Sequence, residues 1–321
     1  MQKFLALYLI ILGVFVCSTS FANQSRTHYL KIDAPTLKNS KLETANEQFI
    51  YIYLPSSYFT SDKKYPVVYY LHGFQGGPFE ARSISGRTLD RYSEQNNIQE
   101  MIIVGINGAN QFGGSFYTNS PVTGNWEDFV TSDVVSYLDN NYRTLPVPEK
   151  RGIVGFSMGG FAAINIAFRH PDKFKHVFTL SPGLFDENGL EKAIKQWNEL
   201  EWGPVLDAYG AAFAPNPQAL DDNLWHEWDP TNPSVVEMWE SGYGNVESKV
   251  DAYLKQKEKL SSIYVEYGSE DQFTWIPEGS QFLVETLRAK GIEVGEHDHG
   301  SGHVVTFVQA EHIIDFFGNA F

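Results

Sequence analysis

Residues 155–160 read Gly-Phe-Ser-Met-Gly-Gly, and this short stretch decides the fold. The apolar run at 151–154 predicts a buried strand before it, and the alanine- and isoleucine-rich run at 161–169 predicts a helix after it. A serine between glycines at such a junction is the pattern of a nucleophile elbow, a tight turn that pushes the hydroxyl clear of the sheet. The helix also directs its positive N-terminal end at that place. So short a pattern also arises by chance. Ser157 is therefore a candidate nucleophile, and the interpretation depends on whether the chain also offers an acid and a histidine in suitable positions.

A second glycine-rich loop precedes the elbow in the chain. The near-continuous apolar run at 65–71 predicts a central strand, and the sequence His-Gly-Phe-Gln-Gly-Gly at 72–77 follows it directly. In proteins with a nucleophile elbow, a loop in this position supplies the other backbone donor to an oxyanion. A plain turn is the alternative interpretation. We expect His72 to brace this loop rather than to transfer protons.

An acidic side chain and an imidazole occupy equivalent places later in the chain. Asp271 follows the strand predicted at 262–267, and His303 follows the strand predicted at 292–297. In parallel sheets, catalytic groups lie in loops at the carboxyl ends of strands, where Ser157 is also predicted to lie. The chain order serine, aspartate, histidine is that of the α/β-hydrolase fold.

The other strand and helix signals alternate over most of the chain. Helices are predicted at 127–142, 280–290 and 304–317, and further strands at 29–32, 49–54, 101–106 and 176–180. We therefore predict the α/β class and an α/β-hydrolase fold. Its mostly parallel central sheet should have about eight strands, with helices on both faces.

The strand pattern stops between residues 184 and 259, where prolines break several helix-prone stretches. This segment is too long for a simple connection, so we predict a helical cap inserted after the sixth strand of a single domain at 23–321. Five of the seven tryptophans lie in it. They form either an aromatic wall over the site, suited to a ring- or sugar-bearing substrate, or the core of the cap itself.

Composition limits the partners of the protein. The 321 residues are 42% hydrophobic, which is ample for a sizeable core. The net charge of −15 and the lack of a basic run argue against a nucleic-acid partner.

The first residues predict a signal peptide at 1–22. Lys3 precedes an apolar run at 4–16 that is too short to span a bilayer comfortably, and Ser-Phe-Ala at 20–22 fits a cleavage site. We expect a secreted or periplasmic protein with no stable membrane insertion after cleavage. The only cysteine, Cys17, lies in this segment, so the mature chain would have no disulfide and no thiolate metal site. A lipoprotein anchor on Cys17 is the alternative, although the residues before it are bulky for one.

On these motifs the chain resembles an esterase family of α/β hydrolases. That family includes esterase D (S-formylglutathione hydrolase), feruloyl and acetyl xylan esterases, siderophore esterases and secreted mycolyltransferases. The resemblance covers about residues 49–317 and rests on Leu71-His72-Gly73-Phe74, Asn125-Trp126-Glu127-Asp128-Phe129, the elbow, Gly268-x-x-Asp271 and Gly302-His303. It is weakest in the insertion, so it implies a reaction class rather than a substrate.

The resemblance implies a serine esterase acting on a small-molecule or carbohydrate-linked ester. Ser157 would attack the carbonyl, His303 would transfer protons and Asp271 would orient His303. The backbone N–H groups of Phe74 and Met158 would hold the oxyanion, and no cofactor is implied. An acyltransferase with the same triad is the alternative. A non-catalytic binding module fits less well, because no triad member is missing.

Several residues admit a second interpretation. Glu270 could replace Asp271 as the acid, but the family spacing favours Asp271. His297, His299 and His303 resemble a metal-ligand cluster, yet no further ligand is evident nearby in the sequence, so we predict no metal.

Two tryptophans lie beside these loops. Trp126 and Trp275 are predicted as substrate-pocket walls, with core packing as the alternative.

Overall fold

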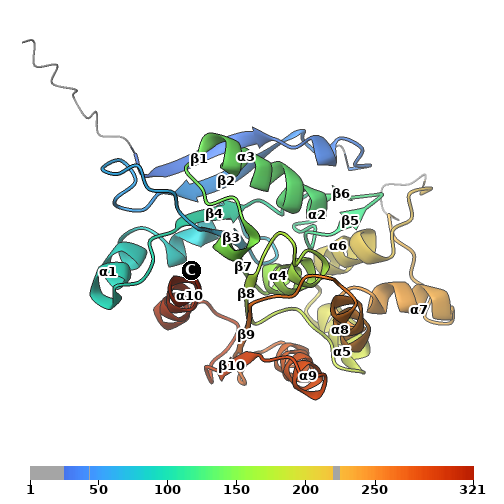
Figure 1. Ribbon diagram of the computed structural model, residues 1–321. Coiled ribbons are helices and arrows are strands. Elements are labelled where there is room, and N and C mark those ends of the chain that lie inside the picture. The colour runs from blue at the N-terminus through green and yellow to red at the C-terminus, as the bar shows by residue number, and fades with distance from the viewer. Residues whose placement is uncertain (1–24, 43, 220–224) are drawn as a thin grey trace, which may run out of the picture.

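A computed structural model of the chain describes residues 25–42, 44–219 and 225–321 (Figure 1). The predicted signal peptide at 1–22 and Cys17 lie outside these residues, so export remains a prediction. Within the described ranges, every helix is too short or too polar to cross a membrane.

An eight-stranded sheet is the frame of the molecule, with the strand order β1-β2-β4-β3-β7-β8-β9-β10. The strands are β1 (Thr27–Asp33), β2 (Glu47–Tyr53), β3 (Val67–Leu71), β4 (Ile102–Ile106), β7 (Arg151–Phe156), β8 (His176–Leu180), β9 (Ser262–Tyr267) and β10 (Gly295–Asp298). The β1–β2 and β2–β4 pairs are antiparallel, and the other pairs are parallel. The short strands β5 (Asn119–Ser120) and β6 (Gly124–Asn125) form a separate ladder. The predicted fold class is confirmed.

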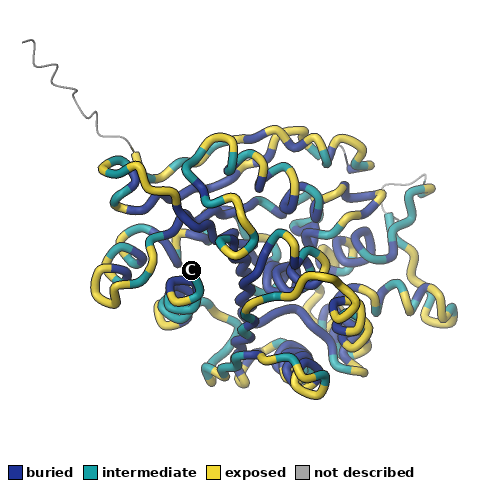
Figure 2. Tube along the Cα trace, viewed as in Figure 1, coloured by how far each residue is buried: buried dark blue, intermediate teal, exposed yellow. Residues whose placement is uncertain are grey.

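The central strands are buried on both faces because hydrophobic residues and glycines occupy most of their positions. Along β3, Val67, Tyr69 and Leu71 pack into one core, whereas Val68 and Tyr70 pack into another. Successive side chains of a strand point to opposite faces, so a continuous apolar run requires cover on both. Figure 2 shows the sheet as the dark blue centre between partly exposed helices.

Helices supply that cover. One face is covered by the 3-10 segment η2 (Pro78–Ile84), α1 (Arg87–Asn96) and α10 (Phe307–Ala320). The other is covered by α4 (Met158–Arg169), α9 (Trp275–Ala289) and a long helix made of α2 (Trp126–Asp128), the π-helical η3 (Phe129–Val134) and α3 (Val135–Asn141). Two short 3-10 segments, η1 (Pro35–Leu37) and η4 (Pro148–Lys150), complete the set outside the insertion.

Several predicted boundaries were wrong, and local features explain two of them. Helix α9 begins earlier than predicted, at Trp275, because Pro277 lies in the first turn, where no backbone N–H is needed. Helix α10 begins later, since Thr306 and Gln309 form a capping box. Strand β10 also begins later than the apolar pattern suggested, at Gly295.

The insertion follows β8, the sixth strand of the main sheet in chain order, and is helical as predicted. It contains α5 (Gly189–Glu199), α6 (Gly203–Phe213), α7 (Pro233–Glu240) and α8 (Val246–Leu254). Its buried side chains belong to the same core cluster as α4 and α9. Among its tryptophans, Trp197 and Trp239 are buried in that core, Trp202 and Trp225 are half-buried, and Trp228 is exposed. The prediction that these tryptophans form the core of the cap therefore holds for only some of the five.

Candidate active site

Ser157 occupies a strained turn between β7 and α4. Its φ of 56° and ψ of −117° lie in a region that non-glycine residues rarely adopt. A Cβ on Gly155 would lie 2.1 Å from the Gly159 carbonyl oxygen, and a Cβ on Gly159 would lie 2.0 Å from the Leu71 carbonyl oxygen. Backbone fills both places, so both positions require glycine. This is the geometry of a nucleophile elbow.

Backbone hydrogen bonds hold the elbow against the next loop. The Ser157 N–H donates to the Leu180 carbonyl at 3.0 Å, and the Gly183 N–H donates to the Ser157 carbonyl at 3.1 Å. Met158 is the first residue of α4, so its own N–H has no acceptor within the helix. The elbow therefore presents one backbone donor beside the serine.

The loop after β3 presents a second donor. The Gly73 N–H donates to Glu80 Oε2 at 3.2 Å, and the Gln75 N–H donates to the Gly113 carbonyl at 3.0 Å. Between them, the Phe74 N–H has no acceptor among the described residues. A Cβ on Gly114 would lie 2.5 Å from Met158 Sδ and 2.6 Å from Phe74 Cδ2, so the two predicted donor residues approach the same glycine.

His72 braces this loop, as the sequence suggested. Its side chain is buried, its Nε2 accepts the Gly108 N–H at 2.9 Å, and its Nδ1 donates to the Gly73 carbonyl at 2.7 Å. Burial lowers the pKa of His72 to about 4. A neutral imidazole with both nitrogens engaged positions backbone and is unsuited to proton transfer.

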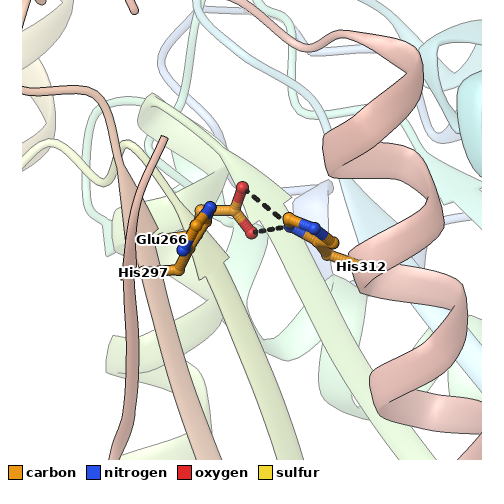
Figure 3. A group of neighbouring side chains, drawn as sticks. All are labelled: Glu266, His297 and His312. Carbon is orange, nitrogen blue, oxygen red and sulfur yellow. Dashed lines mark hydrogen bonds and ion pairs between the residues drawn. The ribbon is translucent and has the colours of Figure 1, made fainter. Parts of the chain in front are cut away.

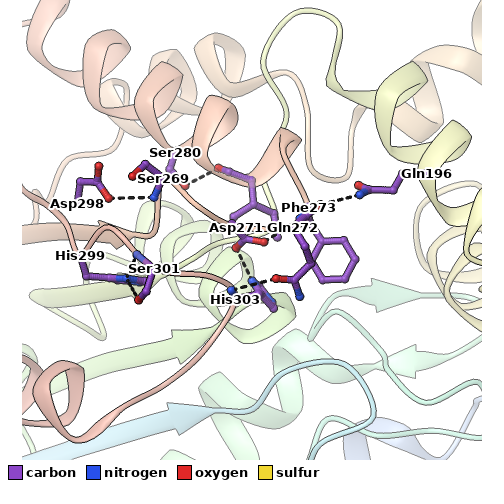
Figure 4. Close-up of polar contacts among 11 residues, drawn as sticks. Gln196, Ser269, Asp271, Gln272, Phe273, Ser280, Asp298, His299, Ser301 and His303 are labelled. Atoms are coloured by element: carbon purple, nitrogen blue, oxygen red, sulfur yellow. Dashed lines mark hydrogen bonds and ion pairs between the residues drawn. The ribbon is translucent and has the colours of Figure 1, made fainter.

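The side chains of Asp271 and His303 lie within hydrogen-bond distance of each other beyond the end of β9. Asp271 Oδ2 lies 2.6 Å from His303 Nδ1, and Asp271 Oδ1 accepts the Phe273 N–H at 2.8 Å (Figure 4). The Asp271 side chain has no exposed surface, and that of His303 is 11% exposed. Glu270, the alternative acid, is exposed to solvent. The carboxylate beside the imidazole is thus the one with the expected spacing.

Close approach of two loops brings this pair together. A Cβ on Gly268 would lie 1.9 Å from the Ser301 carbonyl oxygen, so a side chain there would separate the loop of Asp271 from that of His303. The His303 N–H donates to Gln272 Oε1 at 3.2 Å, which adds a second link between the loops. The glycine of the Gly-x-x-Asp motif therefore has a steric role.

The imidazole lies against the elbow. The ring of His303 packs on the ring of Phe156, the residue before Ser157, with centroids 4.6 Å apart. Among the described residues, the Ser157 hydroxyl and His303 form no hydrogen bond with each other. Such bonds are often long in unliganded enzymes and shorten when substrate binds.

A row of three half-buried aromatic rings starts at the His303 imidazole. We call these three residues the aromatic wall: Phe74, Trp202 and Phe273. Phe273 meets the His303 ring edge-on at 5.2 Å, Trp202 stacks on Phe273 at 5.4 Å, and Phe74 meets Trp202 edge-on at 5.7 Å. Trp202 comes from the insertion. Sequence reasoning missed Phe273 altogether and gave Trp202 no preference over four other tryptophans.

The two tryptophans predicted as pocket walls lie elsewhere. Trp126 is fully buried, donates its indole N–H to the Thr123 carbonyl at 2.8 Å and packs edge-on against Phe129. Trp275 is 4% exposed and packs between Phe185 and other aromatic rings. Both pack in the core, which corrects the prediction, because a fully covered ring has no surface to offer a substrate.

The three histidines considered as metal ligands from the sequence, His297, His299 and His303, do not gather at one site. His303 pairs with Asp271, and His299 Nδ1 lies 2.8 Å from Ser301 Oγ. Because β10 ends at Asp298, the alternation that would place His297 and His299 on one face stops there.

Comparisons with known proteins identify relatives of this chain. The chain is 27% identical over 271 residues to Esterase Rv1288 of Mycobacterium tuberculosis, a match covering 79% of this chain and 52% of that protein. It is 28% identical over 180 residues to Diacylglycerol acyltransferase/mycolyltransferase Ag85A of Mycobacterium leprae, covering 52% of this chain and 49% of that protein. The chain thus spans about half the length of these curated relatives.

The fold has solved counterparts. A ferulic acid esterase superposes with a TM-score of 0.60 at 21% identity, over 92% of this chain and 99% of that one. This likeness establishes the α/β-hydrolase fold. The family model described as Putative esterase matches residues 43–321. The chain therefore belongs to that esterase family.

Proposed function

We propose that the chain is an exported serine esterase that hydrolyses carboxylic esters through Ser157, His303 and Asp271. The observation that carries the proposal is the 2.6 Å contact between Asp271 and His303 Nδ1, next to a strained serine turn. An imidazole fixed in this way keeps its Nδ1 proton and leaves Nε2 free as a base.

The proposed reaction uses these groups in two stages. His303 Nε2 takes the hydroxyl proton while Ser157 Oγ attacks the ester carbonyl, and the N–H groups of Met158 and Phe74 hold the resulting oxyanion. The imidazolium, stabilised by Asp271, returns the proton to the leaving alcohol, so that an acyl-enzyme remains. A water molecule, activated by the same imidazole, releases the acid.

The aromatic wall favours a ring-bearing group in the ester, carried by a small molecule or attached to a carbohydrate. Its half-buried rings begin at His303, beside which the scissile bond would lie. An aromatic ring stacked there would hold the carbonyl near Ser157, since paired rings contribute about 1 kcal/mol beyond their buried area.

Acyl transfer to a sugar or another alcohol is the second candidate function. It is favoured by the match to a mycolyltransferase, which covers 52% of this chain. The same triad serves both reactions, and the acceptor that reaches the acyl-enzyme decides between them. Products formed with and without an added alcohol separate the two.

Replacement of the nucleophile tests the proposal. Ser157→Ala should remove the burst of p-nitrophenol from p-nitrophenyl acetate and lower kcat by about 10⁴-fold or more. It should also abolish labelling by a fluorophosphonate. Ser269→Ala, at an exposed serine near the acid, is the matched control and should retain both. Wild-type turnover in a folded Ser157→Ala variant would refute the assignment.

A further inference from the structure

Three potential metal ligands gather outside the proposed catalytic site, on the face of the sheet covered by α10. Glu266 on β9 pairs in register with His297 on β10, and His312 extends toward both from α10 (Figure 3). One ligand atom from each residue lies within 4.8 Å of the other two. The sequence analysis did not connect these residues, because they come from three different elements.

The Glu266 carboxylate has few hydrogen-bond partners for a buried group. The Glu266 side chain has no exposed surface, and both of its oxygens face a single nitrogen, His312 Nδ1, at 3.1 and 3.2 Å. No other hydrogen-bond donor to this carboxylate occurs among the described residues. Because one imidazole nitrogen satisfies only part of the hydrogen-bonding capacity of a buried carboxylate, a cation would stabilise this place.

From these contacts we propose that Glu266, His297 and His312 bind a divalent transition-metal ion, for which zinc is the best match. Two imidazoles and one carboxylate are a known zinc ligand set, with water completing the tetrahedron. Tetrahedral zinc places its ligand atoms roughly 3.3 Å apart, given bonds of about 2.0 to 2.1 Å. The Glu266–His312 pair is already at 3.1 Å, and His312 is 36% exposed, so an ion can enter from that side.

The ion would fasten the loop that carries His303. That loop joins β10 to α10, so His297 and His312 bracket it, and Glu266 lies on the strand that leads to Asp271. None of the residues proposed for ester hydrolysis is a ligand. The metal therefore acts as a staple between three elements and takes no part in the chemistry at Ser157.

Metal titration of the tag-free protein tests the proposal. After treatment with a chelator, the wild type should bind one Co²⁺ with the visible absorption of a tetrahedral site, and zinc should displace it. Zinc at about a hundred times its Kd should raise Tm by about 5 °C. His297→Ala and His312→Ala should each weaken binding about 100-fold or more and remove the Tm shift. Circular dichroism verifies that both variants are folded.

A neighbouring imidazole provides the control. His299→Ala should bind Co²⁺ as the wild type does, because His299 bonds to Ser301 and lies outside the group. The proposal is overturned if the wild type binds no Co²⁺ at millimolar concentration, or if His297→Ala and His312→Ala bind it unchanged. Loss of binding in His299→Ala alone would overturn it as well, since the ion would then lie at a different cluster.

Discussion

The serine elbow and the helical insertion contribute to one site by different physical means. At the elbow, backbone atoms about 2 Å from the Cβ positions of Gly155 and Gly159 dictate which residues can stand there. In the insertion, side chains pack against side chains, and Trp202 reaches the site only because α5 and α6 dock beside the loop of Asp271. The elbow is fixed by sterics within a short segment, whereas the aromatic wall is fixed by tertiary packing. Chemistry and selectivity should therefore respond to different mutations.

After replacement of the nucleophile itself, the largest effect is expected at the acid. Asp271→Asn should lower kcat by about 10⁴-fold with a small change in KM, because an amide would hold His303 in the wrong tautomer. Circular dichroism and the unfolding midpoint should remain near those of the wild type. Steady-state kinetics with p-nitrophenyl acetate measures the loss.

Glu270→Gln is the matched control for that change. It alters the adjacent exposed carboxylate, and its kcat should stay within about twofold of the wild type. If Glu270→Gln lost activity and Asp271→Asn kept it, the pairing of acid and imidazole assigned here would be wrong.

A methyl group at the elbow is expected to have the next largest effect. Gly159→Ala would drive a Cβ into the Leu71 carbonyl and should lower the free energy of unfolding by about 3 kcal/mol or more. Chemical denaturation measures this difference. Gly203→Ala, at the start of α6 in the insertion, meets no atom within 4 Å and should change stability by less than about 1 kcal/mol. Equal effects of the two substitutions would contradict the distinction between the two regions.

This distinction also explains what the sequence could predict. Ser157 and the elbow were predictable because glycine spacing and the flanking strand and helix are local signals. The pairing of Asp271 with His303 was predictable because parallel strands bring their carboxyl ends to one edge. Trp202, Phe273 and the Glu266 group were not predictable, since each gains its neighbours from distant elements. The misplacement of Trp126 has the same cause, because proximity in sequence to a motif does not determine burial.

A pH effect on stability is expected from His72, which braces the loop on the elbow side of the site. Its pKa is about 4 in the folded protein, below the ordinary value of 6.5. As pH falls from 6.5 toward 4, the unfolded chain takes up a proton that the folded chain does not. Stability is therefore unaffected by His72 above pH 6.5 and decreases below it, by about 3 kcal/mol in total.

Urea denaturation between pH 7.5 and 4.5 tests this expectation. His72→Gln removes the titrating group while its amide oxygen can still accept the Gly108 N–H. The variant should be less stable at pH 7.5 but should lose less stability on acidification. A wild-type slope in the variant would mean that other groups cause the acid sensitivity.

The smallest effect is expected at the aromatic wall, and it separates selectivity from chemistry. Trp202→Ala should lower kcat/KM for methyl ferulate by about 10-fold, which corresponds to the loss of one stacked ring, and that for the ring-free ester methyl acetate by less than about twofold. Trp228→Ala is the control within the insertion, since Trp228 is exposed and packs on Trp239 rather than near His303. A short aliphatic ester reacts at Ser157 without reaching Trp202, whereas an ester of an aromatic acid needs the ring surface. If Trp202→Ala slowed both esters equally, the tryptophan would support the catalytic loops instead, and the insertion would contribute to the chemistry proposed for Ser157, His303 and Asp271.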